Sequence, residues 1–484
     1  MPDANLPYPL LVDAATGTAA PPLPLENLAA LSSDLPGADQ RSRNSTHLGP
    51  FYAGDADDLT QTGWGIIFAS DADPAIQAQL QPLIDLRQKQ VQDPTLFKVF
   101  SGNTGVQPEQ TAASWAQQRG VSLTASVDPT QGVPYYLLIV GSPERISFEF
   151  QALLKMQWAV GRLCFDDVED YGRYAQAVVQ YESPAFIPVQ RKNAAIWVTR
   201  NPGDLATAML CGAISQAFLA PSKMLGANLK FTLNAFTSDK ATKSQLIDIL
   251  RGNVPGGPPA VIFTGSHGCE YKSDDPLKQR RMQGSMLTQE WTPGTPAGPG
   301  NQFCADDVPA DAQLQGSVGF LFACYSGGCP AQDNYHQGKD GSPINVAPEP
   351  FITRLPQALL SRGMLAVIAH IDMAFPYAFL DTSGTPQPQA VRLPLESMMR
   401  GQRTGVAADS LSGMWSTRSS QLALAQADAQ AQARATPAPP ADSGATTPAP
   451  VSKLIAQMTI ARDDARNYIL LGDPATQLRL HQLK

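Results

Sequence analysis

Short apolar runs alternate with stretches of helical periodicity along most of the chain. The first three runs cover 64–69, 96–100 and 135–141. The stretch after the first run spaces Leu80, Leu83 and other apolar residues by three and four positions, which predicts a helix. Runs that are apolar throughout are typical of strands buried in a parallel sheet. Strands that alternate with helices therefore predict an α/β fold with a doubly wound sheet.

The same alternation begins again after residue 188. It predicts two tandem α/β units, a first over 61–188 and a larger second over 189–424. In the second unit, helices are expected over 205–219, 243–250 and 351–362. Strands are expected over 194–198, 231–236, 260–265, 319–325 and 364–371.

Three segments outside these units break the alternation. Residues 1–60 are rich in Pro, Asp, Ser and Gly without a sustained period, which predicts an extended or loosely packed leader. Residues 425–452 are mostly Ala, Gln, Pro, Thr and Ser and predict a linker, since so few large apolar side chains cannot order it. In 453–484, an apolar run from Tyr468 to Leu471 predicts a strand that returns to the second unit.

Two neighbouring apolar runs of the second unit each deliver one reactive side chain. The run 260–265 is followed by Ser266-His267-Gly268, and Cys324 ends the run 319–325, with glycine at 327 and 328. Parallel α/β sheets carry their chemistry at the carboxyl ends of strands, so we expect the two side chains to meet. Imidazole accepts a thiol proton near neutral pH, which generates a nucleophile for carbonyl carbon.

The residues beside this pair suit attack on a carbonyl. The backbone N–H groups of Gly268 and Cys324 are the expected oxyanion donors. Gly327 and Gly328 are expected to turn the chain sharply away from the thiol. The arrangement requires neither a third catalytic acid nor a metal. Taken singly, His267 is more often a structural histidine and Cys324 more often a packed thiol, but their joint placement at successive strand ends favours a dyad.

The motifs around the pair resemble those of a known family. Ser266-His267-Gly268 and Ala323-Cys324 are similar to the His-Gly and Ala-Cys blocks of clan CD, the caspase-fold cysteine peptidases. Segments 136–143, 160–182 and 470–480 resemble the gingipain branch, through the strand before Gly-Ser-Pro, a "GR…YE" pattern and an "LGDP…L" pattern. The likeness covers about residues 130–484.

This resemblance implies a fold and an activity. The expected fold is a caspase-like sheet with a non-catalytic first unit and a catalytic second unit. The implied activity is a thiol endopeptidase, with His267 as general base and acid and Cys324 as nucleophile. CHAT-type proteases, a related group in bacterial defence and signalling, are a close alternative and imply regulation by an activating partner.

Two features bear on specificity and control. Asp372 follows the strand beyond the cysteine and is our candidate for an acidic pocket that selects Arg or Lys at P1, with Asp204 a weaker second candidate. Either residue is equally compatible with a capping or solvated role. The long Pro/Gly-rich loop 272–315, which contains Lys278 and Arg281, is either a processing element or a surface insertion.

Composition narrows the remaining classes. The net charge of −8 includes no basic block, which argues against nucleic acid as a partner. No run approaches the roughly 18 apolar residues of a membrane span, and the first residues do not resemble a secretory signal, so we expect a cytoplasmic protein. The six cysteines lack CxxC spacing, and no phosphate-binding loop follows a strand, so neither metal nor cofactor is expected.

The partner expected for such a dyad is a protein or peptide substrate. Two other functions stay open. One is a caspase-like scaffold that binds partners without catalysis. The other is a thiol hydrolase or acyltransferase that acts on a small molecule.

Overall fold

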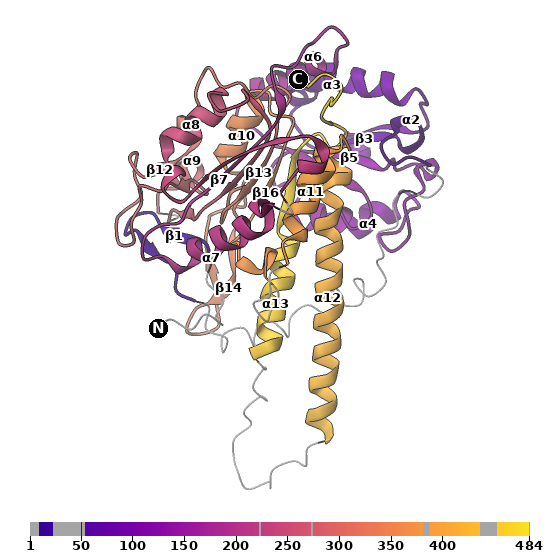
Figure 1. Cartoon of the computed structure of the whole chain (residues 1–484). Helices are drawn as coiled ribbons and strands as arrows, with labels where there is room; N and C mark the ends of the chain where they lie inside the picture. Colours follow the sequence, from indigo (N-terminus) through magenta and orange to yellow (C-terminus); the bar gives the residue numbers. More distant parts are fainter. Residues whose placement is uncertain are drawn as a thin grey trace.

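A ten-stranded sheet forms the centre of the protein, with helices on both of its sides, in a computed structural model (Figure 1). The structure describes residues 9–22, 50, 54–221, 224–272, 274–380, 387–435 and 453–483. Across the sheet, the strands follow the order β4 (Phe97–Phe100), β3 (Trp64–Phe68), β5 (Tyr136–Val140), β6 (Ala159–Leu163), β17 (Tyr468–Gly472), β16 (Ala366–His370), β13 (Val318–Phe322), β9 (Pro259–Gly265), β7 (Arg191–Val198) and β8 (Thr232–Thr237).

The sheet contains two parallel sets that run in opposite directions. The first set is β4, β3, β5 and β6, and the second is β16, β13, β9, β7 and β8. Between them, β17 pairs parallel with β6 and antiparallel with β16. The predicted α/β fold with a large, mostly parallel sheet is confirmed, and the strands expected in both units lie in this one sheet. The antiparallel join also places the carboxyl ends of the two sets at opposite edges of the sheet.

The helices begin and end at residues whose chemistry explains the boundary. In α3, the Asp73 carboxylate caps the first turn by accepting the Ala75 N–H, and Pro74 occupies the first helical position. In α8, Thr242 caps the start and Gly252 adopts a left-handed conformation at the end. The helices are α2 (Leu59–Thr62), α3 (Pro74–Val91), α4 (Ala112–Gln117), α5 (Phe148–Leu154), α6 (Val168–Glu182), α7 (Leu205–Ile214), α8 (Lys243–Arg251), α9 (Pro276–Met282), α10 (Arg354–Ser361), α11 (Gln389–Met399), α12 (Thr404–Ala435) and α13 (Lys453–Arg466).

Two helices near the C-terminus differ from the expected linker. Residues 425–435 extend α12, whose far end projects away from the sheet, and α13 packs beside it (Figure 1). The rest of the predicted linker, 436–452, lies outside the described residues. After α13, β17 does not simply rejoin the second unit, because it forms the seam between both units.

A second, smaller sheet lies beside the main one and includes part of the expected leader. Its order is β12 (Gln302–Phe303), β11 (Met286–Leu287), β10 (Gly268–Glu270), β1 (Leu11–Asp13) and β2 (Thr18–Ala19). Residues 9–22 are therefore packed rather than loose, because the backbone of β1 pairs with β10 while Val12 is fully buried. The loop 272–315 supplies β11, β12 and α9, and β14 (Gln332–Gln337) pairs with β15 (Pro343–Asn345) elsewhere.

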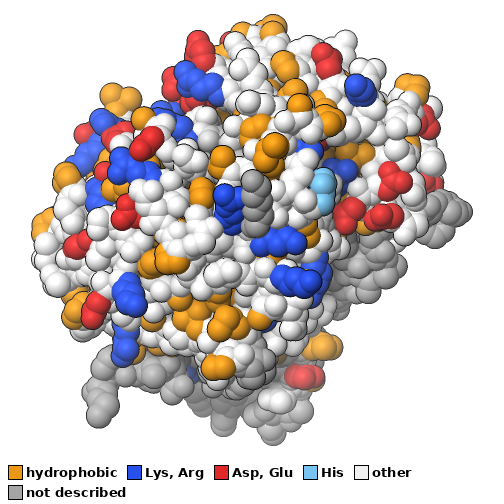
Figure 2. All heavy atoms as spheres, turned by 45° about the horizontal axis from the view of Figure 1, so that its top comes forward, with side chains coloured by type: hydrophobic (Ala, Val, Ile, Leu, Met, Phe, Trp, Pro, Cys, Tyr) orange, Lys and Arg blue, Asp and Glu red, His pale blue; other side chains and the backbone are white. Residues whose placement is uncertain are grey.

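Figure 2 shows basic, acidic and hydrophobic side chains interspersed over one face of the molecule. Among the helices in the described ranges, none combines the length and apolarity needed to cross a membrane.

Candidate active site

The two reactive segments meet at the carboxyl edge of the second strand set. Strands β9 and β13 are parallel neighbours, and Gly265 pairs with Phe322 just before the two segments begin. The Ser266 N–H donates to the Phe322 carbonyl at 3.1 Å. Gly268 lies so close to Cys324 that a Cβ on it would stand 1.9 Å from the Cys324 carbonyl oxygen. Only glycine fits at position 268, and it brings the backbone after His267 against the backbone of Cys324.

The imidazole of His267 is held by Asp204. Its Nε2 lies 2.9 Å from Asp204 Oδ2, and both side chains are buried. Asp204 also caps α7 by accepting the N–H and hydroxyl of Thr207 at 2.8 and 2.6 Å. Burial works to raise the pKa of Asp204, but the hydrogen bonds from His267 and Thr207 lower it overall. The carboxylate of Asp204 accepts a hydrogen bond from the Nε2–H, and in the ring tautomer that donates this bond the lone pair lies on Nδ1.

The free nitrogen of His267 is enclosed by protein. Nδ1 is buried and has no hydrogen-bond partner in the described part of the chain. The ring also meets Trp291 edge-on, with 5.6 Å between ring centroids. A buried ring nitrogen without a hydrogen-bond partner destabilises the folded state, so its presence calls for a functional explanation. Nδ1 is therefore the candidate base nitrogen.

The thiol of Cys324 faces the loop after β16. Its Sγ accepts the Ala374 N–H at 3.1 Å. The side chain is fully buried, and this burial raises the pKa of the thiol well above its ordinary value. Because Nδ1 of His267 has no partner, no hydrogen bond joins imidazole and thiol in the described residues. In this arrangement the thiol is protonated and unreactive.

The turn that follows the thiol is held against β16. The Tyr325 N–H donates to the Asp372 carbonyl at 2.9 Å, and Tyr325 adopts a φ of 56°. The unusual conformation expected of Gly327 and Gly328 thus falls on Tyr325. The two glycines are required for space, since a Cβ at Gly327 would stand 2.9 Å from the Ala369 Cβ. A strained residue next to a nucleophile is typical of functional turns.

The expected oxyanion donor already holds a peptide carbonyl. The Gly268 N–H donates to the carbonyl oxygen of Leu10 at 2.8 Å. The Leu10 N–H in turn donates to the carbonyl of Ala374 at 3.0 Å. Ala374 therefore contacts the thiol through its N–H. Its carbonyl accepts from Leu10 and also lies 3.7 Å from the Cys324 Sγ. The Leu10 side chain is only 1% exposed.

Asp372 is buried beside this turn without a cationic partner. Its carboxylate accepts hydrogen bonds from Asn334 Nδ2 at 2.7 Å and from the Met373 N–H at 2.8 Å. Burial raises the pKa of Asp372 to about 7 and that of Glu270 also to about 7. Within the described ranges, neither carboxylate forms an ion pair with Lys or Arg. Asp204, the weaker pocket candidate, is instead engaged with the imidazole.

The loop considered as a processing element is folded. Its basic run lies in α9, where Arg281 Nε donates to Asp306 Oδ2 at 2.8 Å and Arg280 pairs with Glu349 at 2.5 Å. From the same loop, Trp291 reaches His267, and Asn201 Nδ2 fastens the loop by donating to the Trp291 carbonyl at 3.0 Å. The loop therefore forms a wall of the site.

Sequence reasoning missed three contributors to the site. Trp291, Ala374 and Leu10 lie in loops or in the expected leader, and no motif marks them. The role of Asp204 had a local signal, because an Asp before a helical stretch is a typical cap, but its contact with His267 is tertiary.

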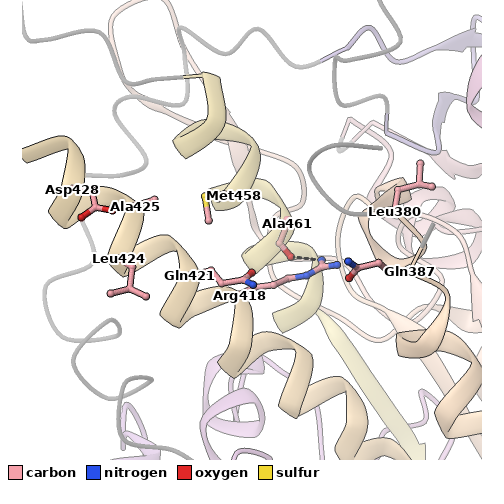
Figure 3. Close-up of a pocket in the computed structure, with 9 residues that line it drawn as sticks. All are labelled: Leu380, Gln387, Arg418, Gln421, Leu424, Ala425, Asp428, Met458 and Ala461. Carbon is pink, nitrogen blue, oxygen red and sulfur yellow. Dashed lines mark hydrogen bonds between the residues drawn. The ribbon is translucent and has the colours of Figure 1, made fainter. Parts of the chain in front are cut away.

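Two further features of the described residues bear on bound groups. No cluster of three or more His, Cys, Asp or Glu side chains in these ranges has the geometry to hold a metal ion. A cavity of 440 Å³ lies between α12 and α13 (Figure 3). Arg418 lines it, donates to the Ala461 carbonyl at 2.8 Å and lies 4.0 Å from Asp464. Asp464 holds the Phe375 N–H at 2.9 Å, which links this cavity to the Ala374 loop.

Comparison with known proteins gives distant structural likeness only. Neither a protein-family model nor a curated protein matches the sequence. A solved complex of Porphyromonas gingivalis RgpB pro- and mature domains is 11% identical, over 86% of this chain and 80% of that one, with a TM-score of 0.43. A structure described as a protease is 10% identical over 86% and 78%, with a TM-score of 0.47. The Saccharomyces cerevisiae separase-securin complex aligns over 70% of this chain and 16% of that one, at 8% identity and a TM-score of 0.32.

Proposed function

We propose that the protein is a cysteine endopeptidase with a His267/Cys324 dyad. His267 Nδ1 takes the Cys324 proton, and the thiolate attacks a substrate carbonyl carbon. The N–H groups of Gly268 and Cys324 stabilise the oxyanion. The imidazolium then returns the proton to the leaving amine, and water hydrolyses the thioester. Asp204 acts as a positioning residue, because it fixes the imidazole tautomer.

One observation carries this proposal above the others. The Gly268 N–H, packed against the Cys324 backbone, holds a peptide carbonyl at 2.8 Å. That peptide runs extended beside β10 and hydrogen-bonds on its other side to Ala374. A site that binds an extended peptide through backbone groups, beside a thiol and an imidazole, fits peptide hydrolysis better than small-molecule chemistry.

The proposed P1 preference is for Arg or Lys, with Asp372 as the acidic group. Its carboxylate lies two residues from Ala374 and lacks a cationic partner among the described residues. A substrate guanidinium or ammonium would supply the missing charge, which favours its binding over that of a neutral side chain.

The test uses fluorogenic peptides that differ only in the P1 residue. We expect cleavage after Arg or Lys by the wild type, and a loss of that preference in Asp372→Asn. Cleavage after Asp, with none after Arg or Lys, would contradict the basic pocket. No cleavage of any peptide, even by a variant whose thiol reacts with an alkylating probe, would contradict the peptidase.

A non-catalytic scaffold is the second candidate, and one observation favours it. Cys324 is fully buried and shares no hydrogen bond with His267. A scaffold would keep Cys324 unreactive under all conditions, whereas a regulated enzyme would expose it. An activity-based probe that alkylates Cys324 only when the site opens separates the two.

A further inference from the structure

The occupant of the peptide-binding site is a segment of this same chain. Leu10 bridges the site, because its carbonyl accepts from Gly268 and its N–H donates to Ala374. A substrate residue needs the same two contacts, so that its carbonyl reaches the oxyanion donors while its chain stays extended. Leu10 therefore makes the two backbone contacts expected of a residue whose carbonyl is attacked.

The segment after Leu10 is fastened on both of its sides. Strand β1 runs parallel to β10, with Leu11 opposite Gly268 and Asp13 opposite Glu270. The Ala14 N–H donates to the Glu270 carbonyl at 3.0 Å. The segment is therefore an added strand at the edge of β10, which is how many proteins bind extended peptides.

The loop between the two reactive strands closes over the other side of the segment. The Ala297 N–H donates to the Ala14 carbonyl at 2.8 Å, and the Gly294 N–H donates to the Gly17 carbonyl at 2.7 Å. Gly17 has a φ of 64° and packs against Thr295 so tightly that a Cβ there would meet its carbonyl oxygen at 1.7 Å. Such contacts fix the register of the segment and make its position specific.

We propose that residues 9–19 are an intramolecular substrate mimic that occludes the thiol of Cys324, with Leu10 in the P1 position. The inference rests on the proposed function only in its use of the term P1, since occlusion itself requires no catalysis. The segment binds through its backbone, and the apolar side chain of Leu10 lacks the positive charge that is proposed for a preferred P1 residue. A tethered segment of this kind acts at an effective concentration on the order of millimolar, and release of the segment switches the site on.

The first experiment alkylates the full chain and measures the rate at Cys324 from the labelled peptide that contains it. Leu10→Asp places a carboxylate at a fully buried position, so the segment should leave the site. We expect Cys324 to react on the order of tenfold faster or more than in the wild type, as the open population grows. The matched control is Thr18→Asp, which adds the same charge to the same segment at an exposed position of β2.

Cys164 reports whether the fold survives. It follows β6, at the opposite edge of the sheet, and its alkylation rate should be the same in all three proteins. A synthetic peptide with the sequence of residues 9–19 should slow Cys324 alkylation in Leu10→Asp again. The same peptide with Asp at its second position should not.

Equal Cys324 alkylation in the wild type and in folded Leu10→Asp would overturn the occlusion. If that variant unfolds, hydrogen exchange on the wild type decides instead. The Gly268 and Leu10 amides must then be protected from exchange, and free exchange of both would also overturn it. A Leu10→Asp protein that alkylates rapidly yet cleaves no peptide would keep the occlusion and reject the peptidase.

Discussion

Two buried charged clusters, one in each half of the molecule, contain similar residues in opposite electrostatic states. In the first, Arg87 of α3 donates to Asp473 Oδ2 at 2.7 Å and to both oxygens of Glu182, at 2.6 and 2.8 Å. These bonds raise the pKa of Arg87 and lower that of Glu182, although burial opposes both shifts. In the second, Asp372, Glu270 and Asp464 lie around the thiol, and burial raises the pKa of each to about 7.

The difference separates a structural role from a functional one. The Arg87 cluster joins α3, α6 and the turn after β17, because its one guanidinium is paired with a carboxylate from each of the other two segments. Asp372 and Asp464 receive hydrogen bonds but too little positive charge, so their burial costs stability. Carboxylates buried without positive charge are typical of sites where a ligand supplies that charge. This favours a binding site around Cys324.

The sharpest way to break this comparison is to remove one thiol from each half. Cys324→Ala should lower peptidase activity by about 10⁴-fold or more, because it deletes the nucleophile. Cys164→Ala, at the carboxyl end of β6 in the first unit, should leave activity within about twofold. Initial rates on the preferred peptide, with each variant checked for folding, give the measurement. Comparable losses in both variants would mean that Cys324 is not the nucleophile.

Removing Arg87 from its cluster with Glu182 and Asp473 should affect stability rather than chemistry. Arg87→Met leaves Glu182 and Asp473 buried without a counter-charge, so the free energy of unfolding should fall by about 3 to 5 kcal/mol. Arg173→Met is the matched control, since Arg173 pairs with Asp170 at an exposed position of α6 and should cost no more than about 1 kcal/mol. Denaturant unfolding measures both. Equal effects would show that the Arg87 cluster does not stabilise the junction of α3, α6 and the turn after β17.

Changing the partner of the imidazole should affect chemistry rather than stability. Asp204→Asn offers an amide N–H to His267 Nε2 and favours the wrong tautomer, so kcat should fall on the order of 10² to 10⁴-fold. Stability should change little, because Asn caps helices as well as Asp does. Asp73→Asn, the cap of α3, is the control and should alter neither property. If kcat is retained in Asp204→Asn, Asp204 serves only as a helix cap.

The smallest effect expected is a pH dependence of stability. Asp372 has a pKa of about 7 in the folded state and one near 4 when unfolded. Between these values the folded state binds more protons, so stability falls as pH rises from about 4 to about 7. Asp372→Asn should remove part of this slope and stabilise the protein at pH 8 by about 1 to 4 kcal/mol.

The control for this effect is Asp311→Asn, which changes an exposed carboxyl group and should leave the slope nearly as it is. Thermal unfolding across pH 4 to 8 provides the measurement. A stability that rises through this window in the wild type, and still does so in Asp372→Asn, would show that the buried carboxylates are paired after all.

Much of the main sheet could be predicted from the sequence, because fully buried strands consist of continuous runs of apolar residues. The strand over 64–69 and the strand that ends before His267 follow this rule. Strand β6 escaped it, since Gly161 and the buried Arg162 interrupt its apolar character. Arg162 is tolerated there because its guanidinium donates to Gln151 and to the carbonyls of Gly141 and Ile146. These partners of Arg162 lie in other segments, so the local sequence pattern does not predict that the arginine is buried.

The motifs used for the family likeness were informative for two different reasons. His267 and Cys324 lie at adjacent strand ends, as their positions after apolar runs predicted. Glu182 and Asp473, from the "YE" and "LGDP" segments, meet at Arg87 instead and serve the join between units. The sequence could mark both pairs of residues as unusual. Only their partners in three dimensions show which pair lies at the candidate site and which pair has a structural role.

By itself, the sequence determined most of the buried strands and which of them are followed by a histidine or a cysteine, because both properties are local. The tertiary structure alone decided what those side chains face: Asp204 for the imidazole, Ala374 for the thiol and Leu10 at the oxyanion donor. These contacts join positions 63, 50 and more than 250 residues apart. Distance along the chain carries no information about such pairs, since they form only when separate elements pack into one sheet edge.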